Sequence, residues 1–316
     1  MKRNTNIPLS IGMSGKYKIE IKRNNTIIKE TDWFDNLITD YGISNAKEGN
    51  IQRCVVGTGV TTPTVLDLKL EQQIAFINQL PVISNSIENN KKATVYKFTF
   101  PKGSVIGNIT EVGVSNRGST DKIISRSLIT DSNNIPTALT ITDIDELSVY
   151  YKILMSVSFA DSPVHVLNYN NTNYNVKIKR LFKHIPAVDS SYGYLGSFTC
   201  NYPFMSMVYG DYPLSNVNDN SNTPFPNANN TTNSVHDVSH GIIEQVIEEG
   251  SNFVIRKVIL KNTEYNDARG IRYFPLINGD FYINFSSLYY FEFDPPLVKT
   301  NTQELSFTYK VSWGRD

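Results

Sequence analysis

Apolar and polar residues alternate with a period of two along several stretches of the chain, as in a strand with one buried face. The stretch at residues 16–22 reads KYKIEIK, and the stretch at 305–313 places Leu, Phe, Tyr, Val and Trp at every second position. Asn24-Asn25 follows the first stretch and predicts a tight hairpin turn into a partner strand at 26–31. The two ends of the chain therefore predict strands.

Most of the remaining apolar runs are also short and separated by turn-rich stretches, which favours antiparallel strands with short connections. The further strands we expect lie at residues 51–56, 94–100, 110–115, 123–129, 147–159, 174–181, 253–261, 281–285 and 288–293.

Helical spacing is suggested at two places. Leu66, Leu70, Ile74 and Ile77 would share one face of a helix, which predicts a short helical segment near residues 65–78 that ends before Pro81. Residues 36–42 predict a second, shorter helix, closed by a glycine.

These patterns predict an all-β protein of antiparallel, sandwich-like domains with one short helical segment near residues 65–78. The expected organisation is a β domain at residues 1–160 that contains the helix, and a second β-rich domain at 161–316. Residues 211–241 are rich in Asn, Pro, Ser and Thr and contain few aliphatic residues. They predict either a long exposed loop that carries recognition or a linker that orders against a neighbouring subunit.

The 316-residue chain is charge-balanced, with 30 basic and 30 acidic side chains. This balance argues against nucleic-acid binding driven by phosphate contacts and against adhesion to an anionic membrane. No apolar run has the length of a signal peptide or a membrane span. We therefore expect no membrane insertion and synthesis in a cytoplasm.

Candidate metal and thiol chemistry is sparse. His236 and His240 have the spacing of a helical metal pair but lie in the Asn-rich stretch, so exposed polar side chains are the favoured interpretation. Cys54 and Cys200 are far apart in sequence, and buried free thiols are favoured over a disulfide. We expect no metal site and no cofactor.

Two motifs suggest catalysis or phosphate binding. Asp143 and Asp145 have the residue type and spacing of a glycosidase acid pair, but a solvated turn is favoured. Gly57-Thr58-Gly59 follows a predicted strand, yet no Gly-Lys-Ser/Thr follows it, so a structural turn is favoured over a phosphate loop. No enzyme is expected.

An ordered series of short motifs in residues 15–160 resembles a group of bacteriophage tail and tail-fibre proteins. The series comprises Trp33-Phe34-Asp35-Asn36-Leu37 to Gly42, Val56-Gly57-Thr58-Gly59, Thr61-Thr62-Pro63-Thr64 with Asp67 and Leu70, Ile109 to Gly113, Ser125 to Ile129 and Leu147 to Tyr151. The resemblance implies a virion component whose N-terminal half attaches to other tail proteins. It implies no catalytic residues. Glu111 is expected to pair with Arg126.

The resulting hypothesis is a non-enzymatic structural protein of a phage tail (fibre, baseplate or adaptor) that contacts other tail proteins and forms a homo-oligomer. Aromatic residues suit such contacts, although ordinary sheet core is an equally weighted interpretation for the later segments. The interface candidates are Trp33, Phe34, Tyr192, Tyr194, Phe198, Tyr202, Phe204, Tyr209, Tyr212, Tyr289 and Tyr290.

Two alternatives stay open. The first is a receptor-binding module that recognises host-surface glycan or protein through loops between residues 192 and 241. The second is a polysaccharide depolymerase that uses Asp143 and Asp145.

Overall fold

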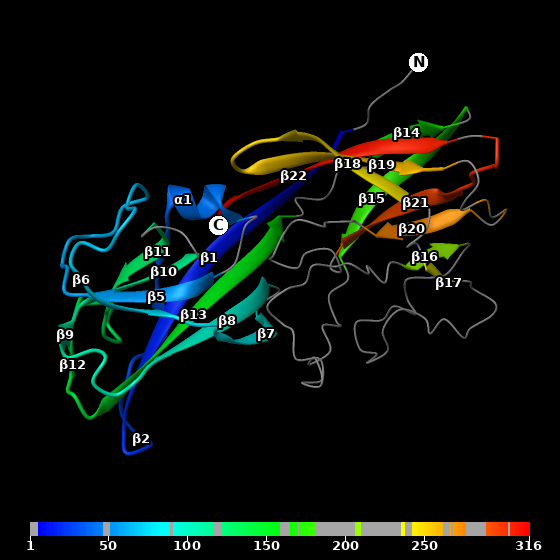
Figure 1. The fold of residues 1–316 in the computed structure, drawn as a ribbon. Coiled ribbons are helices and arrows are strands. Elements are labelled where there is room, and N and C mark those ends of the chain that lie inside the picture. The colour runs from blue at the N-terminus through cyan, green and yellow to red at the C-terminus, as the bar shows by residue number, and fades with distance from the viewer. Residues whose placement is uncertain are drawn as a thin grey trace. The chain divides into compact units, whose positions relative to one another are not determined.

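The computed structural model describes residues 6–46, 51–88, 91–116, 122–158, 165–169, 171–180, 206–209, 235–237, 242–261, 266, 268, 270–275, 289–302 and 304–316. The described part is almost entirely antiparallel β-structure with one short helix, so the predicted all-β class is confirmed (Figure 1).

The chain divides into two compact units. The first, which we call the N-terminal unit, is formed mainly by Ile11–Val157 with Trp313–Asp316, and the second contains most of the residues from Ser158 to Ser312. The candidate surface described below lies in the N-terminal unit.

One sheet of the N-terminal unit has five strands in the order β4-β11-β10-β5-β6. Their bounds are β4 Leu37–Ile38, β5 Ile51–Gly57, β6 Gln73–Asn78, β10 Glu111–Asn116 and β11 Ile123–Leu128. Every pairing is antiparallel. Strands β5, β10 and β11 are almost wholly buried, whereas β6 is largely exposed.

A second sheet contains β1, β13, β8 and β7 in that order, with β2 and β3 paired to β1. The bounds are β1 Asn6–Arg23, β2 Thr26–Glu30, β3 Phe34–Asp35, β7 Val82–Glu88, β8 Lys91–Phe100 and β13 Asp145–Ser158. A separate small pair joins β9 Gly107–Ile109 to β12 Leu139–Ile141. The hairpin predicted at Asn24-Asn25 is confirmed: both residues have positive φ, 50° and 63°.

The core of the N-terminal unit lies between these two sheets. Tyr17 of β1 is fully buried, its ring centroid is 5.0 Å from that of Tyr151 of β13, and its hydroxyl donates to Ser125 Oγ of β11 at 3.1 Å. Burial raises the pKa of the Tyr17 hydroxyl well above its usual value. Contacts between side chains from both sheets give the two-layer packing of a β-sandwich.

The short helix α1 spans Asp40–Ser44, whereas the sequence suggested a helix over 36–42. Thr39 caps it by accepting a hydrogen bond from the Gly42 amide at 3.0 Å. Gly42 lies inside the helix because it packs on β11: a Cβ there would collide with the backbone carbonyl of Ile124.

The helix predicted near residues 65–78 is wrong. Residues 65–72 form an irregular loop, and 73–78 form the strand β6, paired to β5. The backbone amides of Glu71 and Gln72 donate to the Glu111 carboxylate, so they are unavailable to a helix. Tertiary partners have overridden a local helical spacing.

The second unit contains a six-stranded sheet in the order β14-β15-β21-β20-β16-β17, and strands β18, β19 and β22 in consecutive pairing. The bounds are β14 His165–Tyr169, β15 Thr172–Arg180, β16 Ser206–Tyr209, β17 Val235–Asp237, β18 Ile242–Glu249, β19 Phe253–Leu260, β20 Ile271–Pro275, β21 Tyr289–Leu297 and β22 Leu305–Arg315. Within the stretch 211–241 only β17 is described, and it is a strand. The strand predicted at 281–285 lies outside the described residues.

Candidate interaction surface

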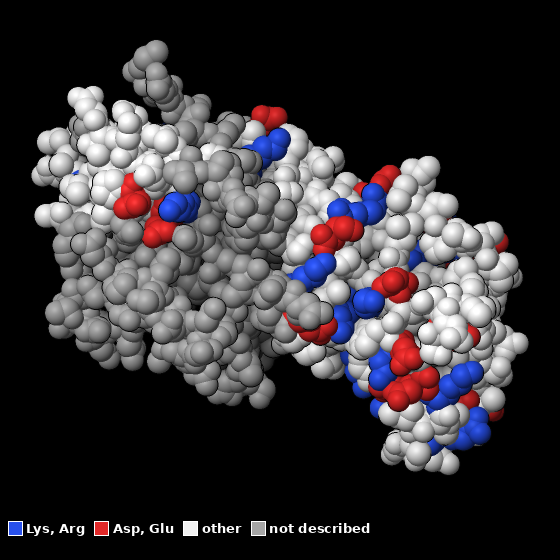
Figure 2. Space-filling view, turned by 180° about the vertical axis from the view of Figure 1, so that it is seen from behind, with Lys and Arg blue, Asp and Glu red and all other residues white. Residues whose placement is uncertain are grey.

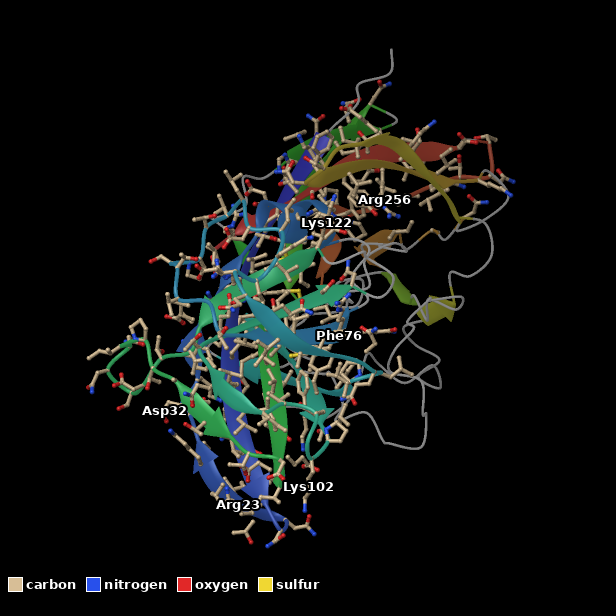
Figure 3. All side chains as sticks on the ribbon, turned by 60° about the vertical axis from the view of Figure 1, so that its left-hand side comes forward. Arg23, Asp32, Phe76, Lys102, Lys122 and Arg256 are labelled. Atoms are coloured by element: carbon tan, nitrogen blue, oxygen red, sulfur yellow. The ribbon has the colours of Figure 1, made fainter. Side chains whose placement is uncertain are left out.

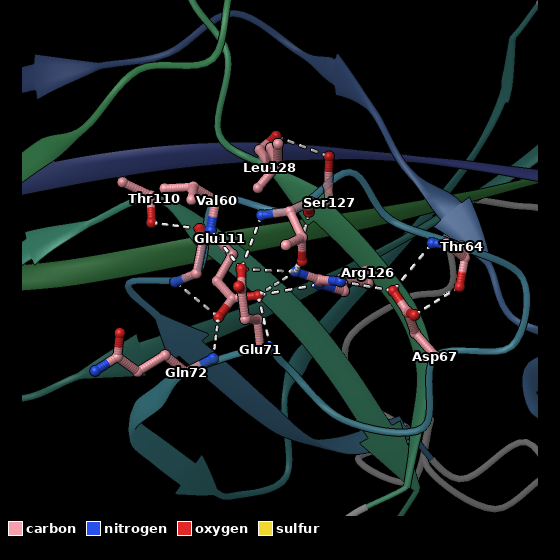
Figure 4. Close-up of polar contacts among 12 residues, drawn as sticks. Val60, Thr64, Asp67, Glu71, Gln72, Thr110, Glu111, Arg126, Ser127 and Leu128 are labelled. Atoms are coloured by element: carbon pink, nitrogen blue, oxygen red, sulfur yellow. Dashed lines mark hydrogen bonds and ion pairs between the residues drawn. The ribbon is translucent and has the colours of Figure 1, made fainter.

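A buried carboxylate organises the loop between β5 and β6. Glu111, at the start of β10, is completely buried, and its Oε1 accepts hydrogen bonds from the amides of Gly59 (3.0 Å) and Gln72 (2.8 Å). Its Oε2 accepts from the amide of Glu71 (3.1 Å) and from Arg126 Nε (3.0 Å). Both ends of the loop are therefore fastened to one side chain (Figure 4).

Arg126 of β11 is also buried and fastens the middle of the loop. Its guanidinium donates to Asp67 Oδ2 at 2.6 Å and to the carbonyl and hydroxyl oxygens of Thr61 at 3.1 and 3.2 Å (Figure 4). The predicted pairing of Glu111 with Arg126 is confirmed, with 2.9 Å between Arg126 Nη2 and Glu111 Oε2. A buried arginine requires such partners, since an unpaired buried charge is strongly unfavourable.

Two further carboxylates, Glu71 and Asp67, accept hydrogen bonds from backbone amides of the same loop. Glu71 Oε2 accepts from the amides of Val60 and Thr61 at 2.6 and 2.7 Å, and the hydrogen bond from the Thr61 amide is the main cause that lowers the pKa of Glu71. Asp67 accepts from the Thr64 amide and hydroxyl. Burial acts to raise the pKa of Asp67, but hydrogen bonds from Thr64 and Arg126 outweigh it and lower the pKa. We call Asp67, Glu71, Glu111 and Arg126 the arginine–carboxylate cluster.

The glycines of the Gly57-Thr58-Gly59 motif make room for this cluster. A Cβ on either glycine would lie 2.5 Å from Glu111 Oε1, well inside van der Waals contact. The structure has the structural turn expected for this motif. Glycine is required at both positions because the Glu111 side chain lies too close for a Cβ.

The loop and the strand that follows it expose large apolar side chains. Leu66 is 75% exposed and Phe76 is 52% exposed, in contrast to the buried Leu70 between them. The exposed members of this segment, which we call the 60–82 segment, are Val60, Leu66, Leu68, Ile74, Phe76, Leu80 and Val82.

The carbonyls of Val65 and Leu68 accept from the amides of Asp40 and Ile123, which places the loop beside α1 and β11, whereas β6 is at the other edge of the sheet. Leu66 and Leu68 therefore belong to one exposed apolar region and the side chains of β6 to another.

Strand β6 is the last strand of its sheet, and no described strand pairs with its outer side. The amide of Gln79 donates to the carbonyl of Gln52, which fixes the hydrogen-bonding phase of the β5–β6 pair. By the alternation of antiparallel pairing, the backbone groups of Ala75 and Ile77 face β5, and those of Phe76 and Asn78 face outward. The register shifts at Ile74, which lies between the paired residues Ala75 and Gln73. Figure 3 labels Phe76 on this strand.

Few of the aromatic interface candidates are described in full. Phe34 belongs to the core, 3% exposed and 6.1 Å from Tyr17 by ring centroid, so it does not form an exposed surface in this chain. Trp33 is half-buried, with Lys152 Nζ 4.2 Å from its ring centroid. Tyr209 lies in β16 and Tyr289 and Tyr290 lie in β21, without described side chains. The remaining candidates, Tyr192, Tyr194, Phe198, Tyr202, Phe204 and Tyr212, lie outside the described residues.

The acidic turn before β13 has a structural partner. Both oxygens of Asp145 accept from the Arg23 guanidinium, at 2.9 and 3.2 Å, and Oδ2 also accepts from the Thr142 amide and hydroxyl. Arg23, followed by Thr142, lowers the pKa of Asp145 well below its usual value. A general acid needs a raised pKa, so this geometry does not suit Asp145 to the acid role in glycoside hydrolysis.

The other candidate groups give no site among the described residues. Cys54 is fully buried, and burial raises the pKa of its thiol far above the usual value, which makes it unreactive. His236 lies in β17, whereas His240 and Cys200 lie outside the described residues. The described residues contain no cluster of potential metal ligands, and none of their helices is long and apolar enough to cross a membrane.

Charge does not single out a surface on the face drawn in Figure 2. Lysine and arginine are interspersed there with aspartate and glutamate over the described residues. This mixture provides no single-sign field of the kind that attracts a polyanion. On this face, the distribution of charge therefore does not mark a contact surface.

Comparison with known proteins adds no further constraint: no protein-family model, no curated protein and no solved structure matches this chain.

The exposed side chains of the 60–82 segment were not predicted from the sequence. The helical spacing placed Leu66 and Ile74 on the buried face of a helix, whereas they are 75% and 42% exposed. One signal was available: residues 72–87 carry no charged side chain, and within them 73–78 reads QIAFIN, which suits a strand.

Proposed function

We propose that this chain is a non-enzymatic structural component of a bacteriophage tail, in a fibre, the baseplate or an adaptor, and that it acts through contacts with other tail proteins. The assignment to a tail rests on the motif series of residues 15–160. The mode of action rests on the exposed 60–82 segment.

One observation carries the proposal most directly: an exposed apolar segment is held in a fixed shape. Leu66 and Leu68 protrude from a loop whose ends and middle are fastened by Glu111 and Arg126. A contact surface ordered before binding loses little conformational entropy when a partner arrives. Buried ion pairs add little net stability by themselves, and specifying one conformation is the role that best explains this cluster.

The cluster also explains several of the motifs that resemble the tail proteins. Gly57, Gly59, Asp67, Glu111 and Arg126 come from four motifs of that series, and all five meet around the same loop. These motifs therefore have a structural role in shaping the loop.

The test is incorporation into virus particles. Particles of the phage that encodes this chain are purified and analysed by quantitative mass spectrometry, with the chain supplied as wild type, Leu66→Asp or Ile135→Asp. Leu66→Asp is expected to reduce incorporation at least tenfold, because it places a charge on an apolar contact. The control Ile135→Asp changes an isoleucine that is 59% exposed outside the 60–82 segment, and incorporation is expected to stay normal. Absence of the wild-type chain from particles contradicts the proposal.

A further inference from the structure

We propose that Arg315 of β22 is a positioning residue for the contact made by Leu66: it holds the start of helix α1, and α1 holds the loop backbone next to Leu66. The inference rests on the proposed function and adds how the shape of that contact is controlled.

The backbone beside Leu66 is attached to α1. The carbonyl of Val65, the residue before Leu66, accepts a hydrogen bond from the Asp40 amide at 2.7 Å. Asp40 is the first residue of α1, so its amide is one of the helix-start donors that have no partner within the helix. Leu66 is 75% exposed and follows Val65 directly, so its direction depends on the position of α1.

The arginine–carboxylate cluster holds the other side of Leu66. Asp67 accepts from Arg126, and the Asp67 amide donates to the carbonyl of Thr64 at 3.1 Å, which closes a turn with Val65 and Leu66 at its centre. The cluster therefore fixes this turn at Asp67, whereas α1 fixes it at Val65. A side chain that lies between two attachments needs both of them to keep one direction.

Helix α1 cannot hold this position by itself. It has five residues, and isolated helices of this length are not stable in water. The residues from Trp313 onward belong to the N-terminal unit and lie beside α1 (Figure 1). Trp313 Nε1 donates to the carbonyl of Ile43 at 2.7 Å. Arg315 Nε donates to the carbonyl of Ile38 at 2.6 Å, and its guanidinium forms an ion pair with the Asp40 carboxylate.

Asp40 connects Arg315 to the loop, because its side chain accepts from Arg315 while its amide donates to Val65. Gly42 packs the middle of α1 on β11, whereas Arg315 secures the start of the helix. The side chains of Arg315 and Asp40 are 34% and 55% exposed, and ion pairs at such exposure contribute little to global stability. The main effect of Arg315 is therefore expected on local geometry.

Hydrogen–deuterium exchange of the free chain tests the positioning role. Arg315→Ala is expected to lower the protection factor of the Asp40 amide at least tenfold, because the start of α1 opens more often without this anchor. Asp40→Asn removes the same ion pair and is expected to lower the protection of the same backbone amide. The amides of Gly59 and Gln72, which bond to the cluster, are expected to keep their wild-type protection, so the loosening is local.

Lys18→Ala is the matched control. Lys18 forms a 2.8 Å ion pair with Glu30 between β1 and β2, and the two side chains are 26% and 53% exposed. Removing this pair is expected to leave the protection of the Asp40 amide unchanged. Circular dichroism checks that every variant is folded.

Incorporation into particles, measured by quantitative mass spectrometry, tests whether this position matters for the contact. Arg315→Ala is expected to reduce incorporation at least threefold, whereas Lys18→Ala enters normally. In a chain that already carries Leu66→Asp, Arg315→Ala is expected to add nothing, because it acts through Leu66. A role in stability alone would lower incorporation in both backgrounds.

The outcomes separate this inference from the proposed function. Wild-type protection of the Asp40 amide in Arg315→Ala, normal incorporation of Arg315→Ala when Leu66→Asp is excluded, or an added loss in the Leu66→Asp background overturns the inference and leaves the proposed function standing. Normal incorporation of Leu66→Asp contradicts the proposed contact instead, whatever the exchange of α1 shows.

Discussion

Glu111 illustrates how one side chain fixes the shape of a loop. Its two oxygens accept hydrogen bonds from three backbone amides and from a guanidinium, all in a site without solvent exposure. An ionised carboxylate accepts at both oxygens, whereas an amide side chain accepts at one and donates at the other. The site therefore specifies a carboxylate rather than any polar group of that size.

We expect Glu111→Gln to destabilise the protein by about 1–3 kcal/mol, because the new NH₂ group would face backbone donors and leave them unsatisfied. The free energy of unfolding from urea denaturation measures this loss. Asp143→Asn is the matched control, since Asp143 is exposed and the same chemical change there is expected to have little effect. Equal stabilities for Glu111→Gln and the wild type would contradict the role given to Glu111.

Glu71 and Asp67 predict a response to acid. The pKa values of both groups are lowered in the folded protein, so their contribution to stability is present above their unfolded pKa values of about 4. That contribution is lost as the pH falls through the folded pKa values. The free energy of unfolding is therefore expected to decrease below about pH 4.

Glu71→Gln is expected to make this decrease shallower, because the substituted group no longer titrates. Urea denaturation at about pH 7, 4 and 3 measures the difference between variant and wild type. Parallel pH dependences for the two proteins would show that Glu71 does not contribute.

At the scale of elements, the loop from Gly57 to Gln72 is held at its ends and in its middle by the arginine–carboxylate cluster. Gly59 lies close to two members of the arginine–carboxylate cluster: a Cβ there would be 2.5 Å from Glu111 Oε1 and 2.5 Å from Glu71 Cβ. Adding one methyl group would force the cluster apart.

We expect Gly59→Ala to lower the free energy of unfolding by about 1–3 kcal/mol through overpacking. Gly314→Ala is the matched control, because a Cβ at Gly314 would meet nothing within 4 Å. Thermal unfolding followed by calorimetry compares the two variants with the wild type. If both alanine variants melt alike, the close packing around Gly59 is not a source of stability.

The strands could be predicted from the sequence wherever alternation was regular, because a two-residue period reports a half-buried face directly. This applies to the strands β1 and β22 and to the turn at Asn24 and Asn25. The pairing of Glu111 with Arg126 could also be predicted, because the two residues lie on neighbouring predicted strands. In the structure Gly113 lies opposite Arg126, so Glu111 is a diagonal neighbour of Arg126 across the strand pair.

The region 65–78 could not be predicted because its conformation depends on distant residues. The spacing of Leu66, Leu70 and Ile74 satisfies a helix, but the amides of Glu71 and Gln72 bind Glu111, which is about forty residues away in sequence. Local patterns contain no information about such a partner. The exposed side chains of the 60–82 segment were missed for the same reason.

At the scale of the whole molecule, the N-terminal unit combines a well-packed interior with an uncharged edge strand, β6. Tyr17, Phe98 and Val112 are completely buried between its sheets, while Phe76 on β6 is half exposed. Strand β6 has no charge and no proline, and the register irregularity at Ile74 is a protecting feature of the kind that natural edges use. Under the proposed function, the regular part of this edge is available for contact with another tail protein.

Residue-resolved hydrogen–deuterium exchange of β6, measured on the free chain and on assembled particles, tests this account most directly. The amides of Phe76 and Asn78 face away from β5, so they are expected to exchange rapidly in the free chain and at least tenfold more slowly in particles. The amides of Ala75 and Ile77 bond to β5 and are expected to stay protected throughout. Equally rapid exchange at Phe76 in the free chain and in assembled particles would contradict the claim that this edge is a contact surface.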